Sequence, residues 1–296
     1  MRCRAAARPS PRPDTYVLTV AVIVLTTATS ACRPPLAIAR YAASATAVIE
    51  KFPDAAAALA ASCRRSESYR LRRTGPPWYD GDSVRAACAG RDSALRDVAR
   101  VNRALGNYFA ALSALAGSKD AETAGRVDDL GDAVGGVGVV DPAQARAVTA
   151  LAKFAASRTT AGYRRSKLRD AIAMQNANVQ VVTAALHDVI ERDFGAYLEG
   201  DDAAATRFYR SALTENEAGE PLAAILVRND YDSRHAALGE EADATRALSR
   251  AVVTIGRGHQ RLFDARDHLR ANELLAAIVA SARELEAAMA KINRAF

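Results

Sequence analysis

The chain has 296 residues, of which half are hydrophobic and only 6% are aromatic, so its core must be built mainly from Ala, Leu, Val and Ile. A formal net charge of +6, from 40 basic and 34 acidic residues, is too small an excess to predict a nucleic-acid partner. No long stretch alternates apolar and polar residues with period two, so strands are not expected.

The first 31 residues have the layout of a secretory signal peptide. Four arginines precede an uncharged apolar run over residues 16–25, and small residues follow over 26–31. A membrane-spanning helix needs about 20 apolar residues, so this run is better explained as a cleaved signal. Because residues 1–31 hold four of the 40 basic residues and one of the 34 acidic residues, their removal leaves 36 and 33, which is close to neutral.

The end of this leader carries a further pattern: Thr29, Ser30, Ala31 and Cys32 resemble the lipobox of bacterial lipoproteins. In that family the cysteine is acylated and becomes the mature N-terminus, so the resemblance implies that Cys32 anchors the chain to a membrane of the cell envelope, facing the periplasm. Arg33 stands where many lipoproteins kept in the inner membrane have Asp, which implies delivery to the outer membrane. The alternative is an ordinary signal peptidase cutting after Ala31, which leaves the same end without lipid.

Two more cysteines, Cys63 and Cys88, remain once Cys3 leaves with the leader. In an oxidising compartment this even remainder predicts a disulfide closing a loop of about 25 residues. Two buried free thiols are the alternative. A metal site is not expected, because two cysteines without nearby histidines lack the ligands that zinc needs.

Between these cysteines, residues 72–81 contain two adjacent prolines and the only Trp of the chain. A segment stiffened in this way can present side chains to a partner at little entropic cost. The candidate partner-binding residues, all of types enriched at binding hot spots, are Arg72, Arg73, Trp78 and Tyr79. The alternative is that the two aromatic rings fold back as a plug over the end of the bundle, and the small-residue core favours this.

Helical periodicity continues to the C-terminus. Apolar residues recur at spacings of three and four over 95–116, 168–189 and 275–296, as in coiled-coil-like packing. Asp141 before Pro142 is typical of a helix N-cap. Breaks are expected near residues 74–81, 117–118, 135–142, 162, 200–202, 219–221, 239 and 256–258. The predicted fold is all-α, an elongated antiparallel bundle of six or seven helices over residues 33–296.

Residues 200–213 resemble half of a tetratricopeptide repeat, in which a turn glycine precedes a second helix. The matching positions are Gly200, Ala205, Tyr209, Ala212 and Leu213. No recurrence at the repeat length of about 34 residues follows. A plain helix–turn–helix within the bundle is therefore the preferred interpretation.

No catalytic, cofactor or metal motif is predicted. The glycines over 131–138 lack the strand and the terminal Lys-Ser/Thr of a phosphate loop. His187 lies one helical turn from Glu191, and Asp264 one turn from His268, but the spacings of di-iron and metalloprotease sites are missing. Solvated surface histidines are the simpler interpretation. Because serine-nucleophile signatures are missing too, we expect no enzymatic activity and no cofactor.

A group of basic residues precedes and begins the helix expected over 168–189. It comprises Arg158, Arg164, Arg165, Lys167 and Arg169. These residues could meet anionic headgroups or an acidic partner. A solvated helix face is the simpler explanation.

Together these patterns predict a non-enzymatic, membrane-tethered envelope lipoprotein that acts as a helical scaffold for another envelope protein or a cell-wall component. The apolar stripe over 275–296 could pair with a partner helix or only with its neighbours in the bundle. The alternative function is a periplasmic protein that binds a small ligand or metal in a polar pocket among the helices.

Overall fold

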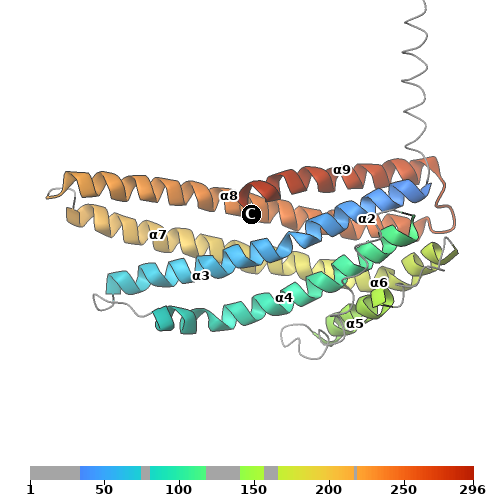
Figure 1. Cartoon of the computed structure of the whole chain (residues 1–296), viewed down its shortest axis with the longest axis horizontal. Helices are drawn as coiled ribbons and strands as arrows, with labels where there is room; N and C mark the ends of the chain where they lie inside the picture. The colour runs from blue at the N-terminus through green and yellow to red at the C-terminus, as the bar shows by residue number, and fades with distance from the viewer. Residues whose placement is uncertain (1–33, 75–80, 118–140, 157–165, 217–218) are drawn as a thin grey trace, which may run out of the picture.

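A computed structural model describes residues 34–74, 81–117, 141–156, 166–216 and 219–296, which form helices and short turns with no β-strand (Figure 1). The elements are α2 (Pro34–Glu50), α3 (Phe52–Thr74), α4 (Gly81–Leu115), α5 (Pro142–Ala156), α6 (Ser166–Val189), the π-helical turn η4 (Ile190–Phe194), α7 (Gly195–Asn216), α8 (Pro221–Asp264) and α9 (Asn272–Ala295). Helix α2 leads directly into α3, and α6 continues through η4 into α7. All these elements together therefore form six continuous helical rods. The predicted elongated, all-α bundle is confirmed.

Two of the predicted helix boundaries have the expected chemistry. Oδ1 of Asp141 accepts hydrogen bonds from the backbone N–H of Ala143 at 2.7 Å and of Gln144 at 2.9 Å, so Asp141 caps α5. Pro142 occupies the first helical position, where a missing N–H is harmless. Gly117 follows α4 with φ of 91°, a left-handed conformation that glycine adopts without a Cβ clash.

Other predicted breaks are wrong. Residues 200–202 lie inside α7, and residues 239 and 256–258 lie inside α8, a single helix of 44 residues. The half repeat over 200–213 is therefore neither a tetratricopeptide unit nor a helix–turn–helix. The chain turns instead over residues 265–271, where the sequence has no strong breaker. Position 162 lies outside the described residues.

Gly258 explains why glycine occurs within a long helix without ending it. A Cβ at this position would lie 2.5 Å from the ring of Tyr41 in α2, closer than carbon atoms approach. The hydroxyl of Tyr41 donates a hydrogen bond to the carbonyl of Ile255 at 2.5 Å. The glycine thus lets a buried aromatic ring of α2 lie directly on the backbone of α8.

The three predicted apolar stripes form the core. Leu105, Phe109 and Leu112 of α4 are fully buried, as are Ile172 of α6 and Leu285 of α9. Helix α9 packs along both α8 and α2. Its stripe over 275–296 therefore pairs with neighbours within the bundle.

Cys63 of α3 and Cys88 of α4 lie at bonding distance, with the two sulfurs 2.01 Å apart, so the predicted disulfide is present. The candidate binding segment follows the end of α3, where Arg72 and Arg73 are exposed. Trp78 and Tyr79 lie outside the described residues, as do Cys32 and the leader. None of the described helices combines the length and hydropathy needed to cross a bilayer.

The bundle has two distinguishable halves along its long axis (Figure 1). The core half contains α2, α5, α6, α9 and the C-terminal parts of α4 and α8. The other half, which we call the arm, consists of α3, α7, the N-terminal part of α4 and residues 221–246 of α8. At about 1.5 Å per residue, α8 spans roughly 65 Å and connects the two.

Candidate functional site

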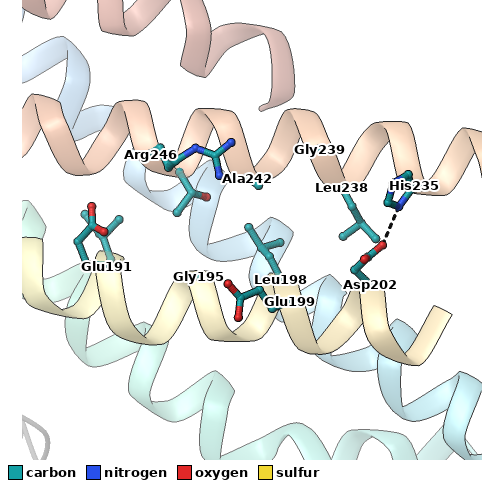
Figure 2. Close-up of a pocket in the computed structure, with 12 residues that line it drawn as sticks. Glu191, Gly195, Leu198, Glu199, Asp202, His235, Leu238, Gly239, Ala242 and Arg246 are labelled. Atoms are coloured by element: carbon teal, nitrogen blue, oxygen red, sulfur yellow. Dashed lines mark hydrogen bonds and ion pairs between the residues drawn. The ribbon is translucent and has the colours of Figure 1, made fainter. Parts of the chain in front are cut away.

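A groove lies between α7 and α8 at the base of the arm (Figure 2). Its volume is about 260 Å³, near the lower end of small-molecule sites. The first wall comes from η4 and α7, and the second from α8. The lining residues are Ile190, Glu191, Gly195, Leu198, Glu199 and Asp202 on the first wall, and His235, Leu238, Gly239, Ala242, Thr245 and Arg246 on the second.

Each wall of the groove contains one glycine. On both walls the lining residues recur at spacings of three and four, so each wall is one helical face. Gly195 and Gly239 stand in the middle of these two faces. A Cβ added at either position would meet no heavy atom within 4 Å. The groove therefore exists where both helices lack a side chain.

The π-helical turn η4 precedes Gly195 and sets the face that α7 presents. A π turn holds an extra residue, so it shifts the residues after it around the helix axis, and such turns occur often at functional sites. Ile190 at its start is buried in the groove floor. Phe194 at its end packs on Phe52 of α3, with ring centroids 5.6 Å apart. Nothing in the sequence signalled this turn.

The groove combines an apolar floor with a mainly acidic rim. Leu198 and Leu238 are buried beneath it, and Glu199 is exposed at the rim. Nδ1 of His235 lies 2.8 Å from Oδ1 of Asp202 on the opposite wall (Figure 2). Tyr231, one turn earlier on α8, stacks on the ring of His235 with centroids 5.7 Å apart. This pairing and stacking hold the imidazole in place.

Beside the groove, Ser249 of α8 joins His187 to Glu191. The serine hydroxyl lies 2.5 Å from Oε1 of Glu191 and 2.9 Å from Nδ1 of His187. Because the hydroxyl has one proton and the carboxylate only accepts, Nδ1 donates to the serine oxygen. A catalytic serine instead gives its proton to histidine. His187 and Glu191, one helical turn apart, are therefore linked through a structural hydrogen-bond bridge.

A cluster of four charged residues lies next to the groove within the arm. Oδ2 of Asp201 accepts hydrogen bonds from Arg65 at 3.1 Å and Arg234 at 2.9 Å, and Glu241 pairs with the same two arginines. Asp201 is 0% exposed. Burial lowers the pKa of Arg234, but the opposing effects of Glu241 and Asp201 are larger and raise it above its ordinary value. We call these four residues the ion cluster, which joins α3, α7 and α8.

A second buried polar cluster lies in the core half, around His259. Its Nε2 is 2.5 Å from the hydroxyl of Tyr108, and its Nδ1 is 2.9 Å from Oδ1 of Asn176. Because the amide oxygen only accepts, Nδ1 carries the proton and Nε2 accepts from Tyr108. Burial lowers the pKa of His259 to about 3, so the ring is neutral. The expectation that the histidines are solvated surface groups is wrong for His259, which is 0% exposed.

Three large apolar side chains are exposed at the far end of the arm. Leu222, Ile225 and Leu226 are 70%, 57% and 62% exposed. Their spacing of three and four places them on one face in the first two turns of α8. We call them the apolar stripe of the arm. The sequence analysis missed them, although an apolar run directly after Pro221 is a readable signal.

The other predicted site residues are dispersed. Arg169 pairs with Asp267 at 3.2 Å, and of the remaining basic group only Lys167 is described. Within the described ranges no group of three or more His, Cys, Asp or Glu residues could hold a metal ion. Comparisons with protein families, curated proteins and solved structures find no match for this chain. The groove and the apolar stripe of the arm are therefore the two candidate binding surfaces of the described residues.

Proposed function

We propose that this chain is an exported, membrane-tethered helical protein of the cell envelope, which binds a partner protein through the end of its arm. The observation that carries the proposal is the apolar stripe of the arm. The long stripes of α4, α6 and α9 are buried, whereas Leu222, Ile225 and Leu226 are more than half exposed. Contiguous exposed apolar side chains are typical of interaction surfaces, and this spacing suits an apolar groove on a partner.

The position of the stripe supports a tethered role. Helix α2 begins at Pro34, two residues after Cys32, and α8 begins at the opposite end of the long axis (Figure 1). An acyl chain on Cys32 would hold the α2 end at the outer membrane and direct the stripe into the periplasm. The anchor itself is supported by the resemblance of residues 29–32 to a lipobox.

The rigidity of the arm supports binding with little ordering cost. The ion cluster joins three of its helices, α3, α7 and α8, and the Cys63–Cys88 disulfide ties α3 to α4. Rings from α3 and α7 also stack, with Tyr69 and Phe208 centroids 5.1 Å apart. A surface that is ordered before association loses less conformational entropy on binding.

Site-specific photo-crosslinking in cells tests the proposal. A photoreactive phenylalanine at Ile225 should give one discrete covalent adduct, and Leu222→Ser with Leu226→Ser in the same chain should abolish it. The matched control places the same group at Met174 of α6, which is 56% exposed but isolated. Identical adduct patterns at both positions, or an adduct that persists in the serine variant, would contradict a role for the stripe.

The tether has a separate test. Cys32→Ser should release the exported protein from the membrane fraction and prevent incorporation of a labelled fatty acid. If the variant stays in the membrane fraction, the lipid anchor is wrong and the partner alone holds the protein there. The alternative function, binding of a small ligand, is favoured by a different observation, the groove between α7 and α8.

A further inference from the structure

We infer that the groove between α7 and α8 binds a small organic cation, an amine or guanidine attached to a short apolar chain. This goes beyond the proposed partner binding and does not depend on it, because the groove and the apolar stripe share no residue. It gives the small-ligand alternative a position and a chemical class of ligand.

The shape of the groove limits the size of its ligand. A volume of about 260 Å³ accommodates a chain of several carbons with one polar head, and it is small for a nucleotide or a peptide. Leu198, Leu238 and Ala242 provide the apolar surface on which such a chain would lie. Each methylene transferred from water to such a surface strengthens binding by about fourfold.

The charges around the groove favour a cation. Glu191, Glu199 and Asp202 lie along the α7 wall (Figure 2), while the opposite wall offers Arg246 and His235. Both of these are already engaged, Arg246 by Asp243 of its own helix and His235 by Asp202. An anionic ligand would face an excess of carboxylates, whereas a cation would be attracted.

Glu199 is the carboxylate best suited to receive the ligand. Glu191 already accepts the hydrogen bond from Ser249, and Asp202 faces His235. Glu199 lies between them along α7 and makes no ion pair with the residues that the structure describes. An ammonium or guanidinium at this position would donate charge-assisted hydrogen bonds to its carboxylate.

The type of cation follows from the residues around it. A quaternary ammonium has no N–H to donate and is usually held by faces of aromatic rings. The groove is lined by carboxylates, aliphatic groups, one hydroxyl, one imidazole and the guanidinium of Arg246, and its lining residues include no Phe, Tyr or Trp. This chemistry selects a cation that donates hydrogen bonds.

Isothermal titration of the purified protein with hexylamine tests the inference, with hexanoate and hexyltrimethylammonium as probes of equal chain length. Hexylamine should bind at least tenfold more tightly than either. Equal binding of hexanoate would overturn the preference for a cation, and no heat from hexylamine at millimolar concentration would overturn the inference as a whole. Equal binding of hexyltrimethylammonium would overturn the claim that the groove selects a cation that donates hydrogen bonds.

Variants place the ligand in the groove. Gly239→Leu should abolish hexylamine binding without unfolding the protein, because its Cβ meets open space. Gly90→Leu in α4, where a Cβ also meets no atom within 4 Å and no groove residue is near in sequence, is the control that should bind normally. Unchanged affinity in Gly239→Leu would overturn the inference.

A charge variant keeps the test independent of packing. Glu199→Gln should weaken hexylamine binding about tenfold, whereas Glu273→Gln, at an exposed position of α9, should not. Equal effects of the two would contradict a specific role of Glu199. The Leu222→Ser and Leu226→Ser variant should bind hexylamine normally, so failure of the partner-binding proposal and failure of this inference give different results.

Discussion

The core half and the arm bury polar groups in opposite ways along the same helix, α8. In the core half, His259 is neutral and both ring nitrogens have hydrogen-bond partners. In the arm, Asp201 and Arg234 form a buried ion pair, and Oδ1 of Asp201 and Nε of Arg234 have no hydrogen-bond partner among the described residues. A satisfied neutral cluster specifies packing, whereas a buried charged cluster depends on each of its members.

This difference indicates how the molecule divides its tasks. The core half buries its three long apolar stripes against one another and holds His259 in a neutral, fully paired cluster. The arm retains buried charge, a groove and exposed apolar side chains, all of which can respond to a ligand or a partner. Each of the following predictions separates the two halves by the size or the sign of an effect.

The largest expected effect is in the ion cluster. Asp201→Ala should lower the free energy of unfolding by about 4 kcal/mol, because it removes the fully buried carboxylate and leaves Arg65 and Arg234 with Glu241 as their one common partner in the cluster. Urea denaturation measures this. Asp243→Ala is the control, since its pair with Arg246 is exposed and should contribute less than about 1 kcal/mol. A loss below that value at Asp201 would mean that the cluster does not hold the arm together.

Loss of the disulfide should have the second-largest effect on the free energy of unfolding. Replacing Cys63 and Cys88 together by Ala should lower the free energy of unfolding by about 3 kcal/mol for a sequence separation of 25 residues. Hydrogen exchange should show faster opening of α3, which this bond ties to α4, with α9 unchanged. Equal acceleration in α3 and α9 would show that the two halves unfold as one unit.

Alanine substitutions at two glycines of α8 should change the stability of the protein in opposite directions. Gly258→Ala should destabilise the protein by about 2 kcal/mol, because its Cβ would overlap the buried Tyr41 ring. Gly239→Ala should stabilise it by up to about 1 kcal/mol, because alanine favours helix and its Cβ meets nothing within 4 Å. Melting temperatures measure both. A change of melting temperature in the same direction at both positions would contradict the distinction between the close contact at Gly258 and the open groove at Gly239.

The last expected effect concerns the dependence of stability on pH. Burial lowers the pKa of His259 to about 3 in the folded state, against about 6.5 when unfolded. As pH falls from 6.5 towards 3, the unfolded state gains a proton that the folded state does not. The free energy of unfolding should therefore fall by about 1.4 kcal/mol per pH unit from this residue alone.

Comparison with a variant isolates that contribution from those of the carboxylates. His259→Asn should show a shallower decline between pH 6 and pH 4 in urea denaturation. His268→Asn, at an exposed position, should keep the steeper decline of the unchanged protein. Parallel curves for His259→Asn and the unchanged protein would mean that His259 is protonated in the folded state.

Much of the fold could be predicted because its signals are local. The apolar spacing over 95–116, 168–189 and 275–296 identifies the faces that are buried, and Asp141-Pro142 identifies the start of α5. The pairing of Cys63 with Cys88 followed from the count of cysteines. The glycines of α8 predicted breaks that do not exist. Glycine within a helix can indicate either a turn or a close approach of another chain segment, and only the packing of the neighbouring helix decides which.

The amino-acid sequence alone determined the helical class, the buried faces and the disulfide, because side-chain periodicity and cysteine number are properties of the chain itself. Only the tertiary structure decided that Gly258 lies against the ring of Tyr41, whereas Gly195 and Gly239 face open space. It also decided that Asp201 pairs with Arg65, 136 positions away in the sequence, and that Leu222 stays exposed. These features depend on which helix faces lie opposite each other. That arrangement is fixed by the packing of all the helices together, including the π turn, which no short stretch of sequence encodes.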